Sequence, residues 1–124
     1  MEIPKDYRCY PLLEPLIVND CEFKEIIIDP HYEEKHGSYL TDRDILKIVQ
    51  QLNLKIFPFN YGRVIEETNI KWQNFFYEPF FYKEKPYRLI WYWEIGNPQL
   101  LVLNCHRVNF KKEYKKLYEE WYGK

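Results

Sequence analysis

Histidine, lysine and arginine side chains at two separated places in the chain could act in acid–base and phosphate chemistry. The first place holds His31 and Lys35-His36, and the second holds Arg88 in one apolar run and His106-Arg107 in the next. An imidazole exchanges a proton near neutral pH, and a guanidinium binds a phosphate through two parallel hydrogen bonds. These side-chain types together predict a site that binds and cleaves a phosphodiester.

The upstream group falls on a short helix expected over residues 30–36. His31, Glu34 and Lys35 have the i, i+3, i+4 spacing that places side chains on one face of a helix, and His36 points elsewhere. A nearby lysine lowers the pKa of a histidine and a nearby glutamate raises it, so this face could hold an acid–base group. Two alternatives stay open, a solvated helix surface with one ion pair and a His-x-x-Glu-x-His metal site that lacks a closing ligand.

The downstream group falls on two strands expected over 86–94 and 100–108, which are rich in aromatic and β-branched residues. Side chains alternate between the faces of a strand, so either His106 or Arg107 could lie beside Arg88, depending on the register. A solvated sheet face that carries arginine, histidine, asparagine and tyrosine would bind a phosphodiester well, although an ordinary half-solvated sheet has the same composition. The candidate substrate-binding residues are Lys35, Tyr87, Tyr92 and Asn104.

Two longer helices and a sheet must position these groups. Thr41-x-x-Asp44 resembles a capping box, and after it the stripe Ile45, Ile48, Val49 and Leu52 predicts a helix over 41–53. A second helix is expected over 110–122, with the stripe Phe110, Tyr114, Leu117 and Trp121 packed on the sheet. The expected core comprises Ile45, Ile48, Val49, Leu52, Leu89, Leu101, Leu103 and Leu117.

The remaining strands are expected over 23–28 and 71–82, with turns at 83–86 and 96–98 that make 71–82, 86–94 and 100–108 antiparallel neighbours. Pro79 predicts an edge position or a bulge in the first of these. Asp29 and Pro30 are expected to start the short helix, and Gly37 to end it in the left-handed conformation. Residues 54–70 are expected to be a connection with some strand near 64–65. The sequence thus predicts an α+β fold, an antiparallel sheet of about four strands with two main helices packed on it.

Composition limits the remaining possibilities. A chain of 124 residues with 46% hydrophobic residues predicts one domain over 1–124, with an irregular segment over 1–20 because of its prolines. Within that segment Leu16-Ile17-Val18 could add a short edge strand, and Asn19-Asp20 predicts a turn after it. A net charge of −1 gives no global basic field. Three cysteines without paired spacing, and no secretion signal or membrane-length apolar run, predict a cytoplasmic protein without a membrane partner. No phosphate loop, HExxH, metal-binding cysteine–histidine quartet or GxSxG motif is present, so we expect no metal and no cofactor.

Along the chain come, in order, a strand, His31 and Lys35-His36, a helix, Pro86 to Trp91 and Asn104 to Arg107. This order resembles that of small toxins of the barnase/RelE-like ribonuclease superfamily, including BrnT-like proteins. The resemblance covers roughly residues 23–108. It implies metal-independent RNA cleavage by a toxin that pairs with a cognate antitoxin. By that likeness His31 or His36 would activate the ribose 2′-hydroxyl, Arg88 and Arg107 would stabilise the charge on phosphorus, and His106 or a tyrosine would protonate the leaving oxygen.

The competing prediction is a non-catalytic protein-binding module, such as an antitoxin, an immunity protein or a phage-encoded inhibitor. Small size, mild acidity and an aromatic content of 19% suit a surface that docks on a protein. Convergence of the cationic groups separates the two functions. If His31, Arg88 and Arg107 line one cleft, the enzyme is favoured. If they scatter while aromatic side chains form an exposed patch, the binding module is favoured.

Overall fold

The fold is built on one six-stranded mixed sheet, in the order β1-β2-β6-β5-β4-β3. The computed structural model describes residues 3–58, 61–65 and 70–123. Strands β2 and β6 run parallel and every other neighbouring pair is antiparallel. The α+β class is confirmed, whereas the expected sheet of about four antiparallel strands is corrected to a larger, mixed one. The strands are β1 Arg8–Val18, β2 Cys21–Ile28, β3 Tyr61–Ile65, β4 Ile70–Tyr82, β5 Lys85–Glu94 and β6 Gln99–Arg107.

The first strand, β1, occupies much of the segment expected to be irregular. It lies at the edge of the sheet and its register with β2 shifts between Pro11 and Leu16, across Pro15. A proline lacks the N–H that a ladder needs, and an edge strand with a register shift tolerates that loss. The expected turn follows at Asn19 and Asp20, both of which adopt positive φ, 52° and 61°.

The helices are short and follow their expected start signals. The Asp29 side chain accepts a hydrogen bond from the His31 backbone N at 2.9 Å, and Thr41 with Asp44 forms the capping box. Gly37 has φ −65°, so its expected left-handed conformation is wrong and the first helix ends in a right-handed turn. The helical elements are η1 Pro30–Tyr32, α1 Glu33–His36, α2 Asp42–Val49, η2 Gln50–Leu52, η3 Lys112–Tyr114 and α3 Lys115–Tyr122.

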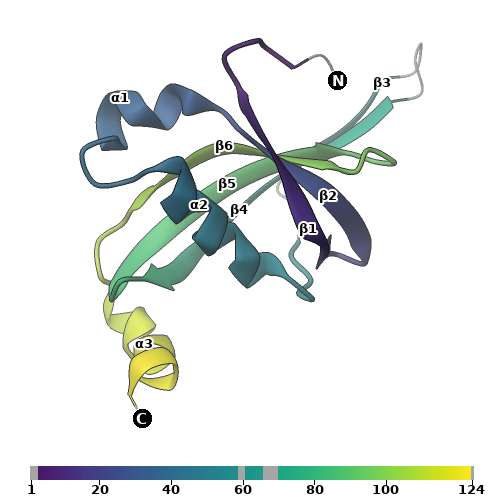
Figure 1. Cartoon of the computed structure of the whole chain (residues 1–124). Helices are drawn as coiled ribbons and strands as arrows, with labels where there is room; N and C mark the ends of the chain where they lie inside the picture. The colour runs from purple at the N-terminus through teal and green to yellow at the C-terminus, as the bar shows by residue number, and fades with distance from the viewer. Residues whose placement is uncertain (1–2, 59–60, 66–69, 124) are drawn as a thin grey trace.

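The core lies between α2 and one face of the sheet (Figure 1). The α2–η2 stripe expected from the sequence is fully buried. On β5, the alternate side chains Tyr87, Leu89, Trp91 and Trp93 are buried against it. Of the eight expected core residues, Leu103 is half-buried and Leu117 is 42% exposed, and the others are buried.

The last helix, α3, packs through a different stripe from the expected one. Tyr118 and Tyr122 place their rings 5.6 and 6.2 Å from the ring of Phe81 at the end of β4, and the Tyr122 hydroxyl accepts a hydrogen bond from the Glu84 backbone N at 2.9 Å. Leu117 and Trp121 therefore turn away from this contact, and Trp121 is 51% exposed. The expected packing of that stripe on the sheet is corrected, because only Tyr114 among its members is buried.

Strand β4 leaves part of one edge accessible. Strand β3 pairs with β4 at residues 70–74, and among the described residues no strand continues this pairing along Phe75 to Tyr82. The β4–β5 register shifts between Tyr77 and Phe80, which is the bulge expected at Pro79. No helix in the described part of the chain is long and apolar enough to cross a membrane.

Candidate functional site

The register of β5 and β6 decides which predicted residues meet on the sheet. Arg88 pairs with His106 and Ile90 with Asn104, so these side chains share a face with Tyr92. Figure 1 places α1 and α2 on the other side of the sheet. Tyr87 pairs with Arg107 on the helix-covered face, where the Arg107 Nε donates to the Tyr87 hydroxyl at 3.2 Å. His106, and not Arg107, is therefore the partner of Arg88.

A second imidazole joins His106 at the edge of this face. The ring of His36, at the end of α1, stacks on the ring of His106 with centroids 5.0 Å apart and planes 17° from parallel. His36 Nδ1 lies 2.7 Å from the Tyr39 hydroxyl, which also accepts a hydrogen bond from the Arg107 backbone N at 3.2 Å. In the Nδ1–H tautomer His36 donates to Tyr39 and leaves Nε2 able to accept a proton.

Both imidazoles favour the neutral form. Burial lowers the pKa of His36, and the charge of Lys35 lowers it further. Burial also lowers the pKa of His106, with smaller contributions from His36 and Arg88. His106 Nδ1 is buried and has no hydrogen-bond partner among the described residues. This stacked pair could exchange protons with a group that reached it.

The arginine on this face is already paired. Arg88 Nε donates to Glu78 Oε1 at 2.6 Å and a second guanidinium nitrogen contacts the same oxygen. Glu78 is also bound by Lys111, 3.3 Å away, and by the Tyr114 hydroxyl. Burial alone would raise the pKa of Glu78, but hydrogen bonds from Tyr114, Arg88 and Lys111 outweigh it and lower the pKa. Glu78 is thus a carboxylate that offsets the charge of Arg88.

The other predicted cations lie apart from the stacked imidazoles. His31 is exposed on the outside of the short helix, 3.5 Å from Glu34, and Lys35 is exposed on the same helix. The Arg107 guanidinium lies over the ring of Tyr39, 4.3 Å from its centroid, on the face opposite Arg88. His31, Arg88 and Arg107 therefore do not line one cleft, and the structure brings together His36, His106 and Arg88 instead.

A third polar cluster holds the N-terminal hairpin to α2. Asp42 accepts two hydrogen bonds from Arg8, at 2.5 and 2.9 Å, and others from the hydroxyls of Tyr10 and Tyr32. Burial opposes ionisation of Asp42, but these donors outweigh it and lower the pKa. Because the Asp42 oxygens are already engaged by side chains of this chain, the cluster stabilises the packing of the N-terminal hairpin on α2.

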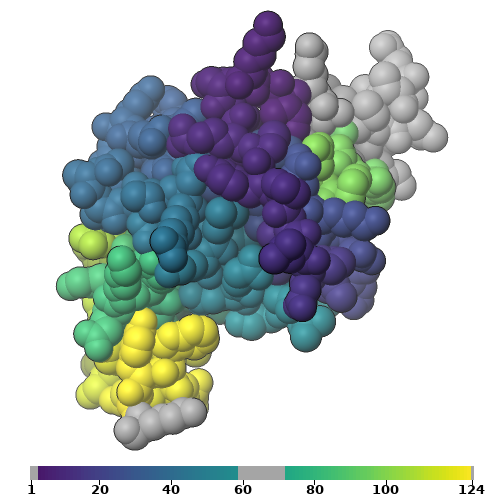
Figure 2. All heavy atoms as spheres, in the orientation of Figure 1, coloured from purple at the N-terminus to yellow at the C-terminus, as the bar shows by residue number. Residues whose placement is uncertain are grey.

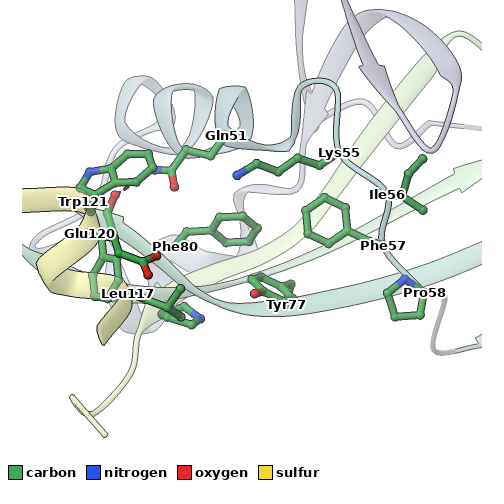
Figure 3. A pocket seen from close by; sticks show the side chains of 12 residues that line it. Gln51, Lys55, Ile56, Phe57, Pro58, Tyr77, Phe80, Leu117, Glu120 and Trp121 are labelled. Atoms are coloured by element: carbon green, nitrogen blue, oxygen red, sulfur yellow. Dashed lines mark hydrogen bonds between the residues drawn. The ribbon is translucent and has the colours of Figure 1, made fainter. Parts of the chain in front are cut away.

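A groove of about 450 Å³ lies beside the part of β4 that follows its pairing with β3 (Figure 3). Its two walls are the loop after η2 and the helix α3. Its floor is aromatic and buried, made by Phe57, Phe80 and Phe81. Its rim is apolar and accessible, with Ile56 67% and Trp121 51% exposed. The lining residues are Gln51, Lys55, Ile56, Phe57, Pro58, Tyr77, Pro79, Phe80, Phe81, Leu117, Glu120 and Trp121.

Two opposite charges reach this groove from its two walls. Lys55 extends from the loop after η2, and Glu120 extends from α3 (Figure 3). Both are exposed, and in the described part of the chain neither forms an ion pair. The groove therefore combines unpaired polar groups with accessible apolar surface, whereas the cationic groups around the stacked imidazoles are mostly engaged.

The sequence did not point to any residue of this groove. Its apolar side chains come from three separate segments, the connection expected over 54–70, the strand expected over 71–82 and the C-terminal helix, and no one of them indicates a groove by itself. One signal was present in the C-terminal helix. Tyrosines at positions 114, 118 and 122 form a second stripe beside Leu117 and Trp121, and only one of these two stripes can pack on the sheet.

Among the described residues, no group of three or more histidine, cysteine, aspartate or glutamate side chains is placed to hold a metal ion. His36 turns to His106 and away from the His31–Glu34 pair, which separates the members of the possible metal motif. Comparison with protein-family models, with curated protein sequences and with solved structures finds no match to this chain.

Proposed function

We propose that this chain is a non-catalytic protein-binding module and that the groove beside α3 is its docking surface. One observation carries the proposal: a buried aromatic floor is bordered by the accessible apolar side chains of Ile56, Leu117 and Trp121. The few residues that supply most of the binding free energy in protein interfaces are enriched in tryptophan and lie in well-packed, desolvated pockets. A soluble protein exposes such a patch at a cost that a partner relieves.

The state of the predicted cations supports the same proposal. Arg88 is neutralised by Glu78, so it cannot receive a phosphate without breaking that ion pair, and Arg107 lies on the opposite face of the sheet from Arg88. The geometric condition for an enzyme, convergence of His31, Arg88 and Arg107, is not met. A binding module such as an antitoxin, an immunity protein or an inhibitor would use the groove for a polypeptide contact, with a second copy or with another protein.

The test compares two exposed apolar side chains in affinity capture. Trp121→Ala removes the side chain at the groove rim, and Leu13→Ala removes a side chain that is 105% exposed on β1 and lies outside the groove lining. We expect the wild-type chain and Leu13→Ala to retain a stoichiometric polypeptide partner, either an untagged second copy or a different protein, from cells that produce this chain. Trp121→Ala should bind that purified partner at least about 30-fold more weakly by calorimetry, the loss of about 2 kcal/mol typical of a hot spot.

The result that would overturn the proposal is equal retention by all three proteins, because the groove would then play no part. Circular dichroism and urea unfolding of each variant serve as the folding controls. A partner lost equally from Trp121→Ala and Leu13→Ala would also count against the groove.

A second candidate function is metal-independent RNA cleavage at the end of the open sheet face, and the stacked imidazole pair favours it. There, His36 Nε2 would take the proton of the ribose 2′-hydroxyl while Tyr39 orients the ring through Nδ1. A protonated His106 would donate to the leaving 5′-oxygen, and Arg88 would have to exchange Glu78 for the phosphate. Since the pKa of His106 is lowered, such activity would be greatest in mildly acidic solution.

This candidate has its own test. Purified protein is incubated with RNA in EDTA, and the products are examined for 2′,3′-cyclic phosphate ends. Cleavage by wild type and by His31→Ala, together with its loss in His36→Ala and His106→Ala, would establish the imidazole pair as an active site. Cleavage that persists in His106→Ala, or that needs added metal, would exclude it. Because some toxins act only on ribosomes, induction of each protein in bacteria and measurement of growth accompany the assay.

A further inference from the structure

We propose that the protein that occupies the groove is a second copy of this chain, docked about a twofold axis. The proposal rests on the groove being a docking surface, and it adds the identity of the occupant. Around a twofold axis the same patch of each copy meets the other, so the patch must complement itself in shape and in charge.

The groove region contains both a projection and a hollow. Trp121 and Leu117 project from α3, and the buried rings of Phe80 and Phe57 form the hollow beside them (Figure 3). A twofold axis between the α3 helices would place the indole of each copy over the hollow of the other. Figure 2 shows the C-terminal segment protruding at one corner of the molecule, where a second body can approach it.

The charges of the groove are also self-complementary. Its two ionic side chains are one cation, Lys55, and one anion, Glu120, on opposite walls. A twofold arrangement would place each Lys55 beside the partner's Glu120 and would form the ion pair twice. The net charge of −1 adds almost no long-range repulsion between two copies.

A charge-reversal experiment tests this arrangement. Lys55→Glu alone would set a carboxylate against the partner's Glu120, and Glu120→Lys alone would set an ammonium group against the partner's Lys55. Each single variant should weaken self-association at least about tenfold, because like charges face each other twice across the interface. An equimolar mixture of the two variants should recover near wild-type association, since every contact in the mixed dimer then joins opposite charges.

Sedimentation equilibrium over protein concentrations from about 5 to about 500 μM provides the measurement. We expect a wild-type dimer, weakened single variants, and recovery both in the mixture and in the Lys55→Glu, Glu120→Lys double variant. Circular dichroism and urea unfolding of each protein control for folding. Glu119→Lys, on the exposed surface of the same helix and outside the groove lining, is the matched control and should dimerise as wild type does.

Three outcomes would overturn the proposal. A wild-type chain that stays monomeric over the whole range excludes the second copy. A dimer that neither single variant weakens uses another surface. Recovery in the double variant without recovery in the mixture places the Lys55–Glu120 pair within one chain.

Failure of this proposal is distinguishable from failure of the proposed function. A monomeric chain whose Trp121→Ala variant loses a different polypeptide partner retains the groove as a docking surface and replaces the second copy with that partner. A monomeric chain with no partner that depends on Trp121 removes both.

Discussion

The groove beside α3 and the open face of the sheet differ in how their reactive groups are engaged. On the sheet face, Arg88 is paired with Glu78, and His36 is hydrogen-bonded to Tyr39. In the groove, Lys55 and Glu120 reach toward the same space without an ion pair among the described residues, and Trp121 is half exposed. Arg88 and His36, which look chemical in the sequence, are therefore engaged by other side chains of the chain, whereas Trp121, which was expected to pack on the sheet, is left accessible.

The difference shows that residue type and binding capacity are separate properties. A guanidinium that neutralises a half-buried carboxylate must give up that partner before it binds a phosphate, and the carboxylate is then left with less compensation. An exposed indole beside a hollow needs no such exchange, because docking only removes water from it. Substitutions on each surface test whether this contrast holds.

The largest effect is expected at the carboxylate of the sheet face. Glu78 is 9% exposed and binds Arg88, Lys111 and Tyr114, so Glu78→Gln leaves two cations without their counter-charge. We expect the free energy of unfolding to fall by about 2 kcal/mol in urea titrations, the value typical of hydrogen bonds to a charged group, because Arg88 and Lys111 are themselves partly exposed. Glu119→Gln, on the exposed face of α3, is the matched control and should change it by less than about 0.5 kcal/mol.

Equal stability of Glu78→Gln and wild type would contradict the contrast between the two surfaces. The Arg88–Glu78 pair would then contribute nothing to folding, and Arg88 would be free to bind a ligand. The pH dependence gives a second measure. The pKa of Glu78 is lowered from 4.5, so its contribution is present above that pH and is lost as the pH falls through the folded value. The loss of wild-type stability below about pH 4.5 should therefore be smaller in Glu78→Gln.

The groove is expected to show the opposite behaviour, an effect on association without an effect on folding. Trp121→Ala removes a half-exposed indole whose ring forms none of the aromatic contacts that anchor α3. We expect self-association to weaken at least about 30-fold, or about 2 kcal/mol, while the free energy of unfolding changes by less than about 1 kcal/mol. Sedimentation equilibrium and urea titration measure the two quantities, and Leu13→Ala should change neither. A large loss of stability in Trp121→Ala would mean that the indole is part of the core.

The sequence predicted the elements well where a pattern is local. The capping box at Thr41, the buried stripe of α2, the turn at Asn19 and the hairpin of β5 and β6 all depend on residues close together in the chain, and all are confirmed. The parallel pairing of β2 with β6 was missed, because two strands far apart in the chain carry no local mark of their partnership. The packed face of α3 was missed because the helix carries two competing apolar stripes.

The candidate site was predictable in composition and not in geometry. Alternation correctly placed Arg88 with Tyr92 and His106 with Asn104, but only the register shows that Arg88 meets His106. The helical spacing separated His36 from the face of His31, but it did not show that His36 meets His106 while His31 faces solvent. The pairing of Arg88 with Glu78 spans a bulge at the end of β4, so no spacing rule could anticipate it.

A smaller effect is expected from protonation of the stacked imidazoles. The pKa of both His36 and His106 is lowered from 6.5, so the unfolded chain binds protons more readily than the folded chain. Stability should therefore decline as the pH falls from about 7.5 through 6.5 toward the folded values, and the decline should be reduced in His106→Gln. Urea titrations at about pH 7.5 and about pH 5.5 measure this slope. An unchanged slope in His106→Gln would place the titration elsewhere.

The smallest effect is expected at Tyr39, which links the two surfaces of β6. Its hydroxyl accepts from the Arg107 backbone N and shares a hydrogen bond with His36 Nδ1, so Tyr39→Phe leaves both groups without this partner and keeps the ring under the Arg107 guanidinium. We expect a loss of about 1 kcal/mol in the free energy of unfolding, the net value of a typical hydrogen bond. The pKa of His36, followed by NMR titration, should fall further, because the protonated ring loses an acceptor for its Nδ1–H. Tyr118→Phe, whose hydroxyl makes no hydrogen bond with the described residues, controls for loss of a hydroxyl. A rise in the pKa of His36 would show that Tyr39 favours the neutral ring. His36 Nδ1 would then accept a hydrogen bond from the Tyr39 hydroxyl instead of donating one to it.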